Sequence, residues 1–282
     1  MQSLFFGLGA ALAWGLHDFC VRHLSQRIPV APMLFAVMIA GTLVLVPVSV
    51  LVGGWDRMTP QATGLALMSG LCYAIASYGL YRAFAIGPVR LVAPICGAYP
   101  VLSFGIAALG GRVIDAGQWL AVVAVVAGIA LVARSEEGVA VPANRPAAIA
   151  WATMGAVGFA MTFAVGQIAA KIGAELPVSL LSRLAALALV GGGIVAARVS
   201  LGPIRPHLPL LGLMGVLDIT ALGLVLAAGG LTHPEYAAVA SSIFGIITIL
   251  LAWRILKETV LPRQWLGITT VFAGIAVLSS QG

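Results

Sequence analysis

The most prominent pattern in this sequence is a succession of ten long apolar segments joined by short polar connectors. A hydrocarbon core of about 30 Å is crossed by about 20 helical residues, which is close to the length of most of these segments. The segments are continuously apolar, whereas the strands of a membrane barrel are short and alternate apolar with polar residues. The pattern therefore predicts ten transmembrane helices, near residues 3–24, 32–52, 62–86, 89–110, 117–134, 147–171, 177–198, 208–230, 234–253 and 263–280.

The second half of the chain repeats the first half without gaps at a constant offset of 146 residues, the separation of Gln118 from Gln264. We therefore expect a first five-helix repeat at 1–135, a linker at 136–146 and a second five-helix repeat at 147–282. Because five spans are an odd number, the second repeat enters the membrane from the opposite side. Inverted repeats of this kind build secondary transporters with a central site. The matched positions include Gln118–Leu120 with Gln264–Leu266, Pro60 with Pro206, Met68 with Met214, and Pro88 with Pro234.

The composition narrows the class of protein further. Of the residues, 61% are hydrophobic and 9% are charged, whereas a soluble domain carries about 25% charged residues. The connectors are too short for a soluble domain, so any site must lie within the membrane. The net charge of +6 fits the Lys and Arg excess that flanks membrane helices, and no basic soluble surface is available for nucleic acid. Cys20, Cys72 and Cys96 lack metal-ligand spacing, so neither a metal nor a cofactor is implied.

Several short motifs resemble those of a known family. They are Trp14-Gly15 in the first span, Ala83–Ile86 in the third, Ala93-Pro94 and Tyr99-Pro100 in the fourth, Lys257-Glu258 before the tenth, and Gln-Trp-Leu followed by Ala-Gly-Ile-Ala in each half. On these residues the chain resembles the drug/metabolite transporter superfamily, specifically its EamA-type ten-helix members, and is similar to bacterial amino-acid and metabolite exporters. Arg112, where the family often has Glu, and His17-Asp18, in place of a plainer run, depart from that pattern and leave the subfamily open.

The distribution of positive charge predicts an orientation. Lys and Arg gather beside the odd-numbered connectors, and only Arg57, Arg112 and Lys171 lie beside the even-numbered ones. The positive-inside rule then places the odd connectors in the cytoplasm and both termini outside. Exporters that resemble this chain are commonly drawn with both termini inside, so only the shared side of the termini follows from the sequence.

Polar residues inside the spans are the first candidates for a site, since a charge in hydrocarbon costs at least about 2.5–3.5 kcal/mol. Asp18 lies one helical turn before Arg22 and on the same face as Trp14, which suits either a local ion pair or a polar lip of a cavity. His17, on a neighbouring face, is either a hydrogen-bonded structural residue or a contact for substrate or protons.

Tyrosines in the third and fourth spans are the aromatic candidates. Tyr78, Tyr81 and Arg82 suit either an amphipathic ligand or an interfacial belt with a snorkelling arginine. Tyr99 lies near mid-bilayer and is followed by Pro100, which bends a helix and frees a carbonyl. We therefore expect Tyr99 to line a cavity.

The second half of the chain supplies further candidates. Phe159, Phe163 and Gln167 are spaced four residues apart and share one face of the sixth span. Arg183 and Asp218 are the deepest charges and can pair across the seventh and eighth spans, either as a structural bridge or as part of a transport site. Such a pair would keep Asp218 charged and leave His17 as the remaining proton carrier. We therefore favour gradient-driven movement over obligatory proton antiport.

Together these features predict an all-α integral membrane protein, with ten transmembrane helices in two inverted five-helix repeats around a central cavity. Its walls are expected from spans one, three, four, six, eight and nine. The fifth and tenth spans are expected to be peripheral, packed through the small-residue pairs Ala124 with Gly128 and Thr270 with Gly274. The predicted substrate-binding residues are Trp14, His17, Tyr78, Tyr81, Tyr99, Phe163, Gln167 and Asp218.

The predicted function is secondary transport, namely the export of amino acids or similar small metabolites across a bacterial inner membrane by a lipid-embedded monomer. The short turns at Gly87-Pro88 and Pro234 are expected either to tie gating hairpins on opposite faces or to be tight turns in a rigid bundle. A multidrug or nucleotide-sugar transporter is the alternative within the superfamily. An enzyme is disfavoured because no catalytic or nucleotide-binding motif is visible, and a channel because two divergent halves suggest no ring of polar groups.

Overall fold

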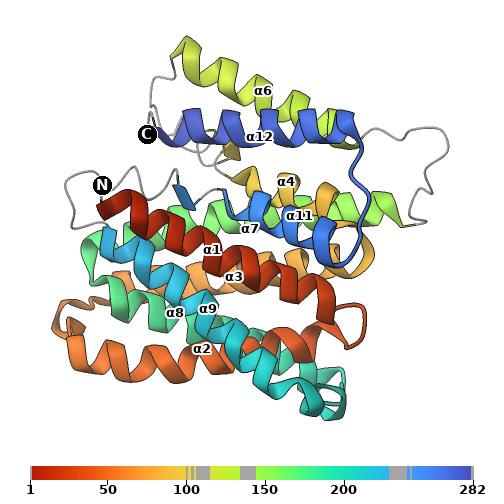
Figure 1. The fold of residues 1–282 in the computed structure, drawn as a ribbon. Helices are drawn as coiled ribbons and strands as arrows, with labels where there is room; N and C mark the ends of the chain where they lie inside the picture. Colours follow the sequence, from red (N-terminus) through yellow and green to blue (C-terminus); the bar gives the residue numbers. More distant parts are fainter. Residues whose placement is uncertain are drawn as a thin grey trace.

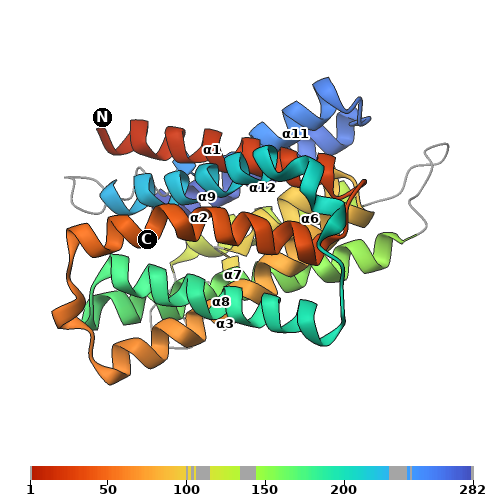
Figure 2. The ribbon, with the colours of Figure 1, turned by 90° about the horizontal axis from the view of Figure 1, so that it is seen from below.

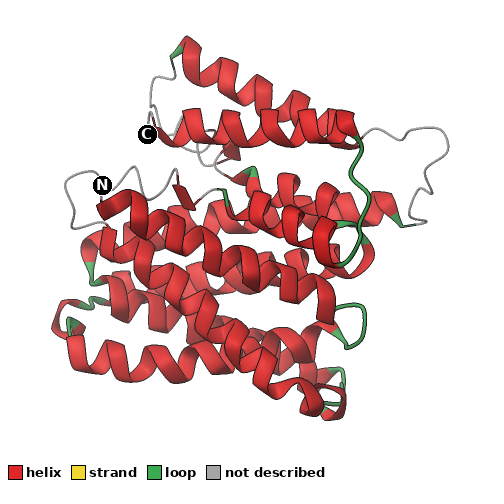
Figure 3. Ribbon diagram, in the orientation of Figure 1, coloured by secondary structure: helices red, strands yellow, loops and turns green. Residues whose placement is uncertain are grey.

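The computed structural model describes residues 2–99, 101–102, 105, 115–133, 144–228, 240–241 and 243–280. All regular elements within these ranges are helical (Figure 3). The α-helices are α1 (Gln2–Leu24), α2 (Val30–Val52), α3 (Pro60–Ile86), α4 (Val89–Gly97), α6 (Ala116–Ala133), α7 (Arg145–Ile172), α8 (Glu175–Ala196), α9 (Leu208–Ala228), α11 (Phe244–Ile255) and α12 (Pro262–Ser280). Two short 3₁₀ helices are η1 (Trp55–Arg57) and η2 (Gly202–His207).

The helices confirm the predicted spans to within a few residues, except in the fourth and ninth spans. There the helices that the structure describes are α4 and α11, and both are shorter than the predicted spans. In the described part of the chain, five helical segments are long and apolar enough to cross a membrane: Val30–Val52, Pro60–Ile86, Arg145–Ile172, Glu175–Ala196 and Gly202–Val225. Ala116–Val132 and Phe244–Ile255 are shorter apolar helices.

The helix contacts show how the two repeats fit together. Helix α1 of the first repeat packs on α9 and α11 of the second, and correspondingly α7 packs on α3 and α4 (Figures 1 and 2). The contact of α2 with α9 has its counterpart in the contact of α3 with α8. Two further contacts join helices that are equivalent in the two repeats, namely α2 with α8 and α6 with α12. The main contacts between the repeats are therefore matched by their equivalents, as expected for two copies of one fold that face each other in opposite orientations.

The pair of helices α6 and α12 is peripheral, as predicted for the fifth and tenth spans. Figure 1 shows the two helices side by side above the bundle, and α4 is their main contact below. Small residues allow this close approach, since a Cβ atom on Gly128 would lie 2.8 Å from the Gly267 carbonyl oxygen. A Cβ atom on Gly274 would lie 3.0 Å from the Ala121 carbonyl oxygen.

The repeated glutamine of the two halves has a structural role at the start of these helices. The Asp115 amide donates to Gln118 Oε1 at 3.1 Å, and the Gln118 amide donates to Asp115 Oδ1 at 2.9 Å, which together form a capping box. At the equivalent position, the Leu261 amide donates to Gln264 Oε1 at 3.0 Å. The glutamine of the Gln-Trp-Leu repeat is therefore explained by helix capping rather than by a substrate site.

Candidate functional site

A cavity of about 240 Å³ lies in the middle of the bundle, between the two repeats. Its lining comes from α1, α3, α7, α9 and α11, from Cys96 on α4 and from Tyr99 just beyond α4. All six spans that were expected to form the walls therefore contribute. Helix α8, the seventh span, also forms a wall and was missing from the predicted set.

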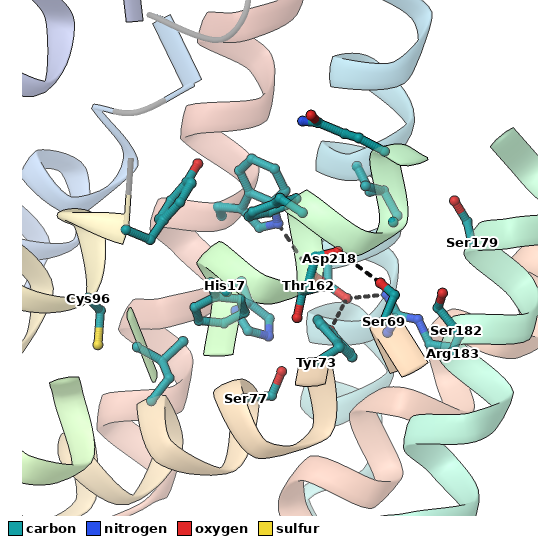
Figure 4. Close-up of a pocket in the computed structure, with 18 of the residues that line it drawn as sticks. His17, Ser69, Tyr73, Ser77, Cys96, Thr162, Ser179, Ser182, Arg183 and Asp218 are labelled. Carbon is teal, nitrogen blue, oxygen red and sulfur yellow. Dashed lines mark hydrogen bonds and ion pairs between the residues drawn. The ribbon is translucent and has the colours of Figure 1, made fainter. Parts of the chain in front are cut away.

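Asp218 on α9 is the centre of the polar network in this cavity (Figure 4). Its carboxylate accepts hydrogen bonds from Arg183 Nη2 at 2.5 Å, from Trp14 Nε1 at 3.3 Å and from the Tyr73 hydroxyl at 3.2 Å. These donors come from α8, α1 and α3, so one carboxylate joins four helices and both repeats. The pairing of Arg183 with Asp218 that their depth suggested is confirmed.

The Arg183 guanidinium is held on all sides by protein. Its centre lies 5.3 Å from the centroid of the Tyr73 ring, a cation–π contact. Its Nη1 atom is buried and has no hydrogen-bond partner among the described residues. That atom lies against Gly41 of α2, where an added Cβ atom would be 3.2 Å from Nη1. Arg183 is 4% exposed, so its positive charge is committed to the packing of α2, α3, α8 and α9.

A second polar cluster lies along α1. Asp18 Oδ1 is 2.9 Å from His17 Nδ1, and His17 Nε2 is 3.0 Å from the Tyr81 hydroxyl on α3. These three residues are 4%, 6% and 2% exposed and all line the cavity. Asp18 is therefore paired with His17 rather than with Arg22, so the local ion pair considered from the sequence is wrong. The other reading, a polar wall of the cavity, matches its position.

An aromatic wall faces these polar groups. It consists of Tyr73, Phe159, Phe163 and Tyr99, whose rings contact one another in that order with centroid separations of 6.4, 6.5 and 5.1 Å. Trp14 packs edge-on against Phe244 at 6.2 Å and adds a further aromatic pair to the lining. The four-residue spacing of Phe159, Phe163 and Gln167 does place all three on the cavity face of α7.

Hydroxyl groups between the helices complete the lining. The Ser69 hydroxyl donates to the Thr162 carbonyl at 2.9 Å, and the Ser182 hydroxyl donates to the Ala66 carbonyl at 2.8 Å. The Thr162 hydroxyl donates to the Gly158 carbonyl at 2.8 Å. The first two bonds hold α3 against α7 and α8, and the third lies within α7. All three use the hydroxyl protons and leave oxygen lone pairs at the cavity surface.

Among the described residues, the cavity lining is exposed at one end of the bundle. Gln167 and Glu175 are exposed and still line it, next to the connector between α7 and α8. His17, Cys96 and Tyr81 lie at buried positions of the same cavity. The mouth is therefore on the side of the even-numbered connectors.

Toward the opposite end lies what we call the Arg22 latch, formed by Arg22, Glu258, the Phe84 carbonyl and the Val89 amide. Arg22 Nε donates to Glu258 Oε1 at 2.7 Å, and Arg22 Nη1 donates to the Phe84 carbonyl at 2.5 Å. Glu258 Oε2 in turn accepts a hydrogen bond from the Val89 amide at 2.8 Å. The latch therefore joins the end of α1, the turn between α3 and α4, and the segment after α11, all at odd-numbered connectors.

Seven of the eight predicted substrate-binding residues line the cavity. The exception is Tyr78, whose ring packs edge-on against Trp151 with centroids 5.7 Å apart. Gly87 and Pro88 lie in the turn between α3 and α4, beside the latch, whereas Pro234 lies outside the described residues. The residues predicted as substrate-binding that do line the cavity are Trp14, His17, Tyr81, Tyr99, Phe163, Gln167 and Asp218.

Several lining residues were missed in the sequence, although a signal for them exists. Ser69, Tyr73, Ser77 and Tyr81 follow one another at intervals of four, so they share a single face of α3, and Tyr78 falls off that face. On α8, Arg183 marks another such face, which also carries Glu175, Ser179 and Ser182.

Two matched sets of helices, one from each repeat, pack around this polar and aromatic cavity. The sequence profile of the EamA-like transporter family matches residues 1–134 and 146–280, one match for each repeat. The chain therefore belongs to the EamA-like transporter family, as the sequence motifs indicated, and this is a family of transporters rather than of enzymes.

A solved structure shares the fold over nearly the whole length of both chains. It is described as "Crystal structure of protein", with a TM-score of 0.67 and 15% sequence identity, and the match covers 98% of this chain and 95% of that chain. At this identity the likeness concerns the fold alone. The comparison with curated proteins gave no match.

Proposed function

We propose that the protein is a secondary transporter of a bacterial inner membrane that exports amino acids or similar small metabolites by alternating access, and that it works as a monomer. The observation that carries this proposal is a cavity with a mouth at one end and the Arg22 latch at the other. A substrate held in this cavity is exposed to one side of the membrane at a time, which is the requirement for alternating access.

The latch supports a gating role for the turn at Gly87-Pro88. Glu258 binds the Val89 amide directly after that turn, so opening the latch would release the α3–α4 hairpin together with the end of α1. By duplication, the segment around Pro234 would close the other face in the second half of the cycle. Under the positive-inside rule the latched face is cytoplasmic and the mouth opens outside.

The polar network bears on energy coupling. Asp218 is bonded to Arg183, and His17 is bonded at both ring nitrogens. A side chain that carries a proton through the transport cycle must exchange its hydrogen-bond partners in the protein for water once in every cycle. We therefore keep the proposal that the substrate gradient, rather than an obligatory proton antiport, drives transport.

Nucleotide-sugar exchange fits this lining less well. A diphosphate needs cationic partners, and the lining residues that the structure describes offer Arg183, which is already paired, and the imidazole of His17. A multidrug transporter remains compatible with the aromatic wall. The cavity therefore favours compact amphipathic substrates over phosphorylated ones.

The function is tested with the purified protein in liposomes. Uptake of labelled amino acids, cationic dyes and sugar nucleotides is compared with uptake into liposomes without protein. The proposal predicts faster uptake of compounds from the first or second group, and little or none of the third. It fails if none of the compounds enters faster than in the protein-free liposomes.

A further inference from the structure

We propose that the cavity selects organic cations, namely compounds with a protonated amine on a flat apolar body and without a free carboxylate. The inference rests on the transport function proposed above and narrows its substrates: among the small metabolites proposed there it favours amines without a carboxylate, and it places free amino acids second. It follows from three features of the described lining, which are its charge balance, the direction of its hydrogen bonds and its aromatic surface.

The charge balance of the described lining is negative. Asp18, Asp218 and Glu175 contribute three carboxyl groups, against the single guanidinium of Arg183. Even with His17 protonated, the carboxyl groups outnumber the positive groups. With a neutral His17, Asp18 and Asp218 outnumber Arg183 inside the cavity, and the exposed Glu175 adds a third carboxyl group at the mouth. A cleft with such an excess of negative charge attracts a cation and repels an anion.

Most hydrogen-bond donors of the polar clusters are already used, and Arg183 Nη1, which has no partner among the described residues, is buried against Gly41. The Trp14 indole, the Tyr73 hydroxyl and Arg183 Nη2 all point at Asp218. The hydroxyls of Ser69, Thr162 and Ser182 donate to backbone carbonyls. What these groups still offer is oxygen lone pairs, which suit the N–H groups of an ammonium ion. A substrate carboxylate would need donors instead.

Arg183 is the obvious partner for a substrate carboxylate, but its contacts within the protein keep the guanidinium from binding one. One side of the guanidinium is bonded to Asp218, one face lies on the Tyr73 ring, and Nη1 is buried against Gly41. To bind a carboxylate, the arginine would have to leave Asp218 as an unpaired buried charge. A zwitterionic amino acid therefore satisfies its amine in this cavity and leaves its carboxylate without a cationic partner.

The aromatic wall provides the remaining contact. Tyr99, Phe163 and Phe159 present continuous aromatic surface on the side facing the polar clusters. Ring faces attract cations and stack on flat apolar groups. An aromatic amine therefore matches both sides of the cavity at once.

The test is a matched pair of ligands that differ only in the carboxylate. Tryptophanamide and tryptophan are titrated into the purified protein in detergent by calorimetry, at a mildly acidic pH at which the amine of the amide is protonated. Tryptophanamide is expected to bind at least about tenfold more tightly, which corresponds to about 1.4 kcal/mol. Equal affinity, or tighter binding of tryptophan, would overturn the inference.

Charge-neutralising variants localise the effect. Glu175→Gln removes an exposed carboxylate at the cavity mouth, so it should weaken tryptophanamide binding several-fold and leave tryptophan unchanged or bound more tightly. Asp56→Asn, an equal change of charge on an exposed connector of the same face, should leave both affinities unchanged. If both variants weaken the amide equally, its binding reflects the overall surface charge and the inference fails.

Asp218→Asn provides a second, stronger test. It removes the carboxylate that occupies Arg183 and makes that guanidinium available to a ligand. The ratio of the two affinities should then shift toward tryptophan. If the ratio of the tryptophanamide affinity to the tryptophan affinity is unchanged in a variant that elutes as a folded protein, Asp218 does not withhold Arg183 from the ligand. The Glu175→Gln comparison does not depend on this variant.

The failure of this inference differs from the failure of the transport function. Counterflow in liposomes is measured with tryptophan and with N,N,N-trimethyltryptamine, a permanent cation that cannot cross lipid as a free base. Transport of tryptophan without the cation contradicts the selectivity and leaves the transporter intact. Tight binding of the amide without counterflow of either compound contradicts the transport function and leaves the binding preference intact.

Discussion

Asp218 accepts three hydrogen bonds at the centre of the cavity, and one of its donors is a buried arginine. Replacing Arg183 with Met would leave a buried carboxylate with two neutral donors, a change that costs about 3–5 kcal/mol when a buried pair is broken. We expect a clearly lower melting temperature in detergent. Thermal unfolding monitored by tryptophan fluorescence measures it.

The matched control for this prediction is the double variant Arg183→Met with Asp218→Leu. Because it removes both charges together, it should recover much of the lost stability. If the double variant is no more stable than the single one, the cost does not come from an unpaired carboxylate, and the central role of the pair is contradicted.

His17 is the residue on which proton coupling would depend. It bonds Asp18 and Tyr81, and a glutamine retains some of this hydrogen bonding without titrating. We expect uptake of N,N,N-trimethyltryptamine into liposomes to be insensitive to an imposed pH gradient, both in the wild type and in His17→Gln. A wild type that requires the gradient, with the requirement lost in His17→Gln, would assign proton coupling to this residue and reverse our preference.

The residue scale also shows where sequence reasoning succeeded and where it stopped. Depth in an apolar segment identified Asp218, Arg183 and His17, because a charge in hydrocarbon needs a partner. Of the two alternatives for Asp18, the ion pair with Arg22 is not formed, because Arg22, one turn away on the same helix, bonds Glu258 from the other repeat. Tyr73 was overlooked, and its contact with Asp218 comes from a helix whose packing cannot be read along the chain.

At the scale of the elements, the Arg22 latch ties three segments together at one face. Glu258→Gln retains the shape of the side chain and removes the ion pair, so closure of that face should weaken. Cys96 is a natural reporter because it is buried and lines the cavity. In a chain that also carries Cys20→Ser and Cys72→Ser, an impermeant maleimide applied to the latched face should label Cys96 faster in Glu258→Gln than in the chain with Glu258.

Asp56→Asn, on the opposite face, serves as the control for that labelling experiment and should leave the rate as it was. Labelling of Cys96 that is equally slow with and without the Glu258→Gln change would show that the ion pair does not hold the face shut.

The turn between α3 and α4 makes a separate prediction. A Cβ atom on Gly87 would lie only 2.7 Å from Ala148 Cβ on α7, so Gly87→Ala should push the hairpin away from α7 and lower the turnover rate. Gly64→Ala on the same helix meets no atom within 4 Å and should leave transport unchanged. Liposome uptake rates compare the two. Equal rates in both variants would argue for a turn without a role in gating.

The elements themselves were largely predictable from hydropathy, since a membrane-spanning segment must be helical and about 20 residues long. For the role of α8 as a cavity wall, the signal in the sequence was Arg183, which fits a structural bridge as well as a transport site. Ser179 and Ser182 lie within a mostly apolar helix, and small hydroxyls of this kind serve equally well as close-packing residues. Only the contacts of α3 with α8 reveal that this face borders the cavity.

At the scale of the whole molecule, the repeat explains why the chain can alternate between two states. Equivalent helices make equivalent main contacts in the two halves. If the helices of one repeat can open or close one face of the membrane, the equivalent helices of the other repeat can do the same at the opposite face. The constant offset in the sequence predicted this symmetry. Which face is closed could not be predicted, because the closure depends on the contact of Arg22 with Glu258 across the repeats.

Counterflow in liposomes tests the central claim, transport by alternating access through this cavity, most directly. Liposomes containing the protein are loaded with unlabelled tryptophan or N,N,N-trimethyltryptamine and diluted into a trace of the same compound in labelled form. The account predicts that label accumulates transiently above its equilibrium level for at least one compound and more strongly for the cation, and that protein-free liposomes show no such overshoot. Simple equilibration of both compounds at the protein-free rate would contradict it.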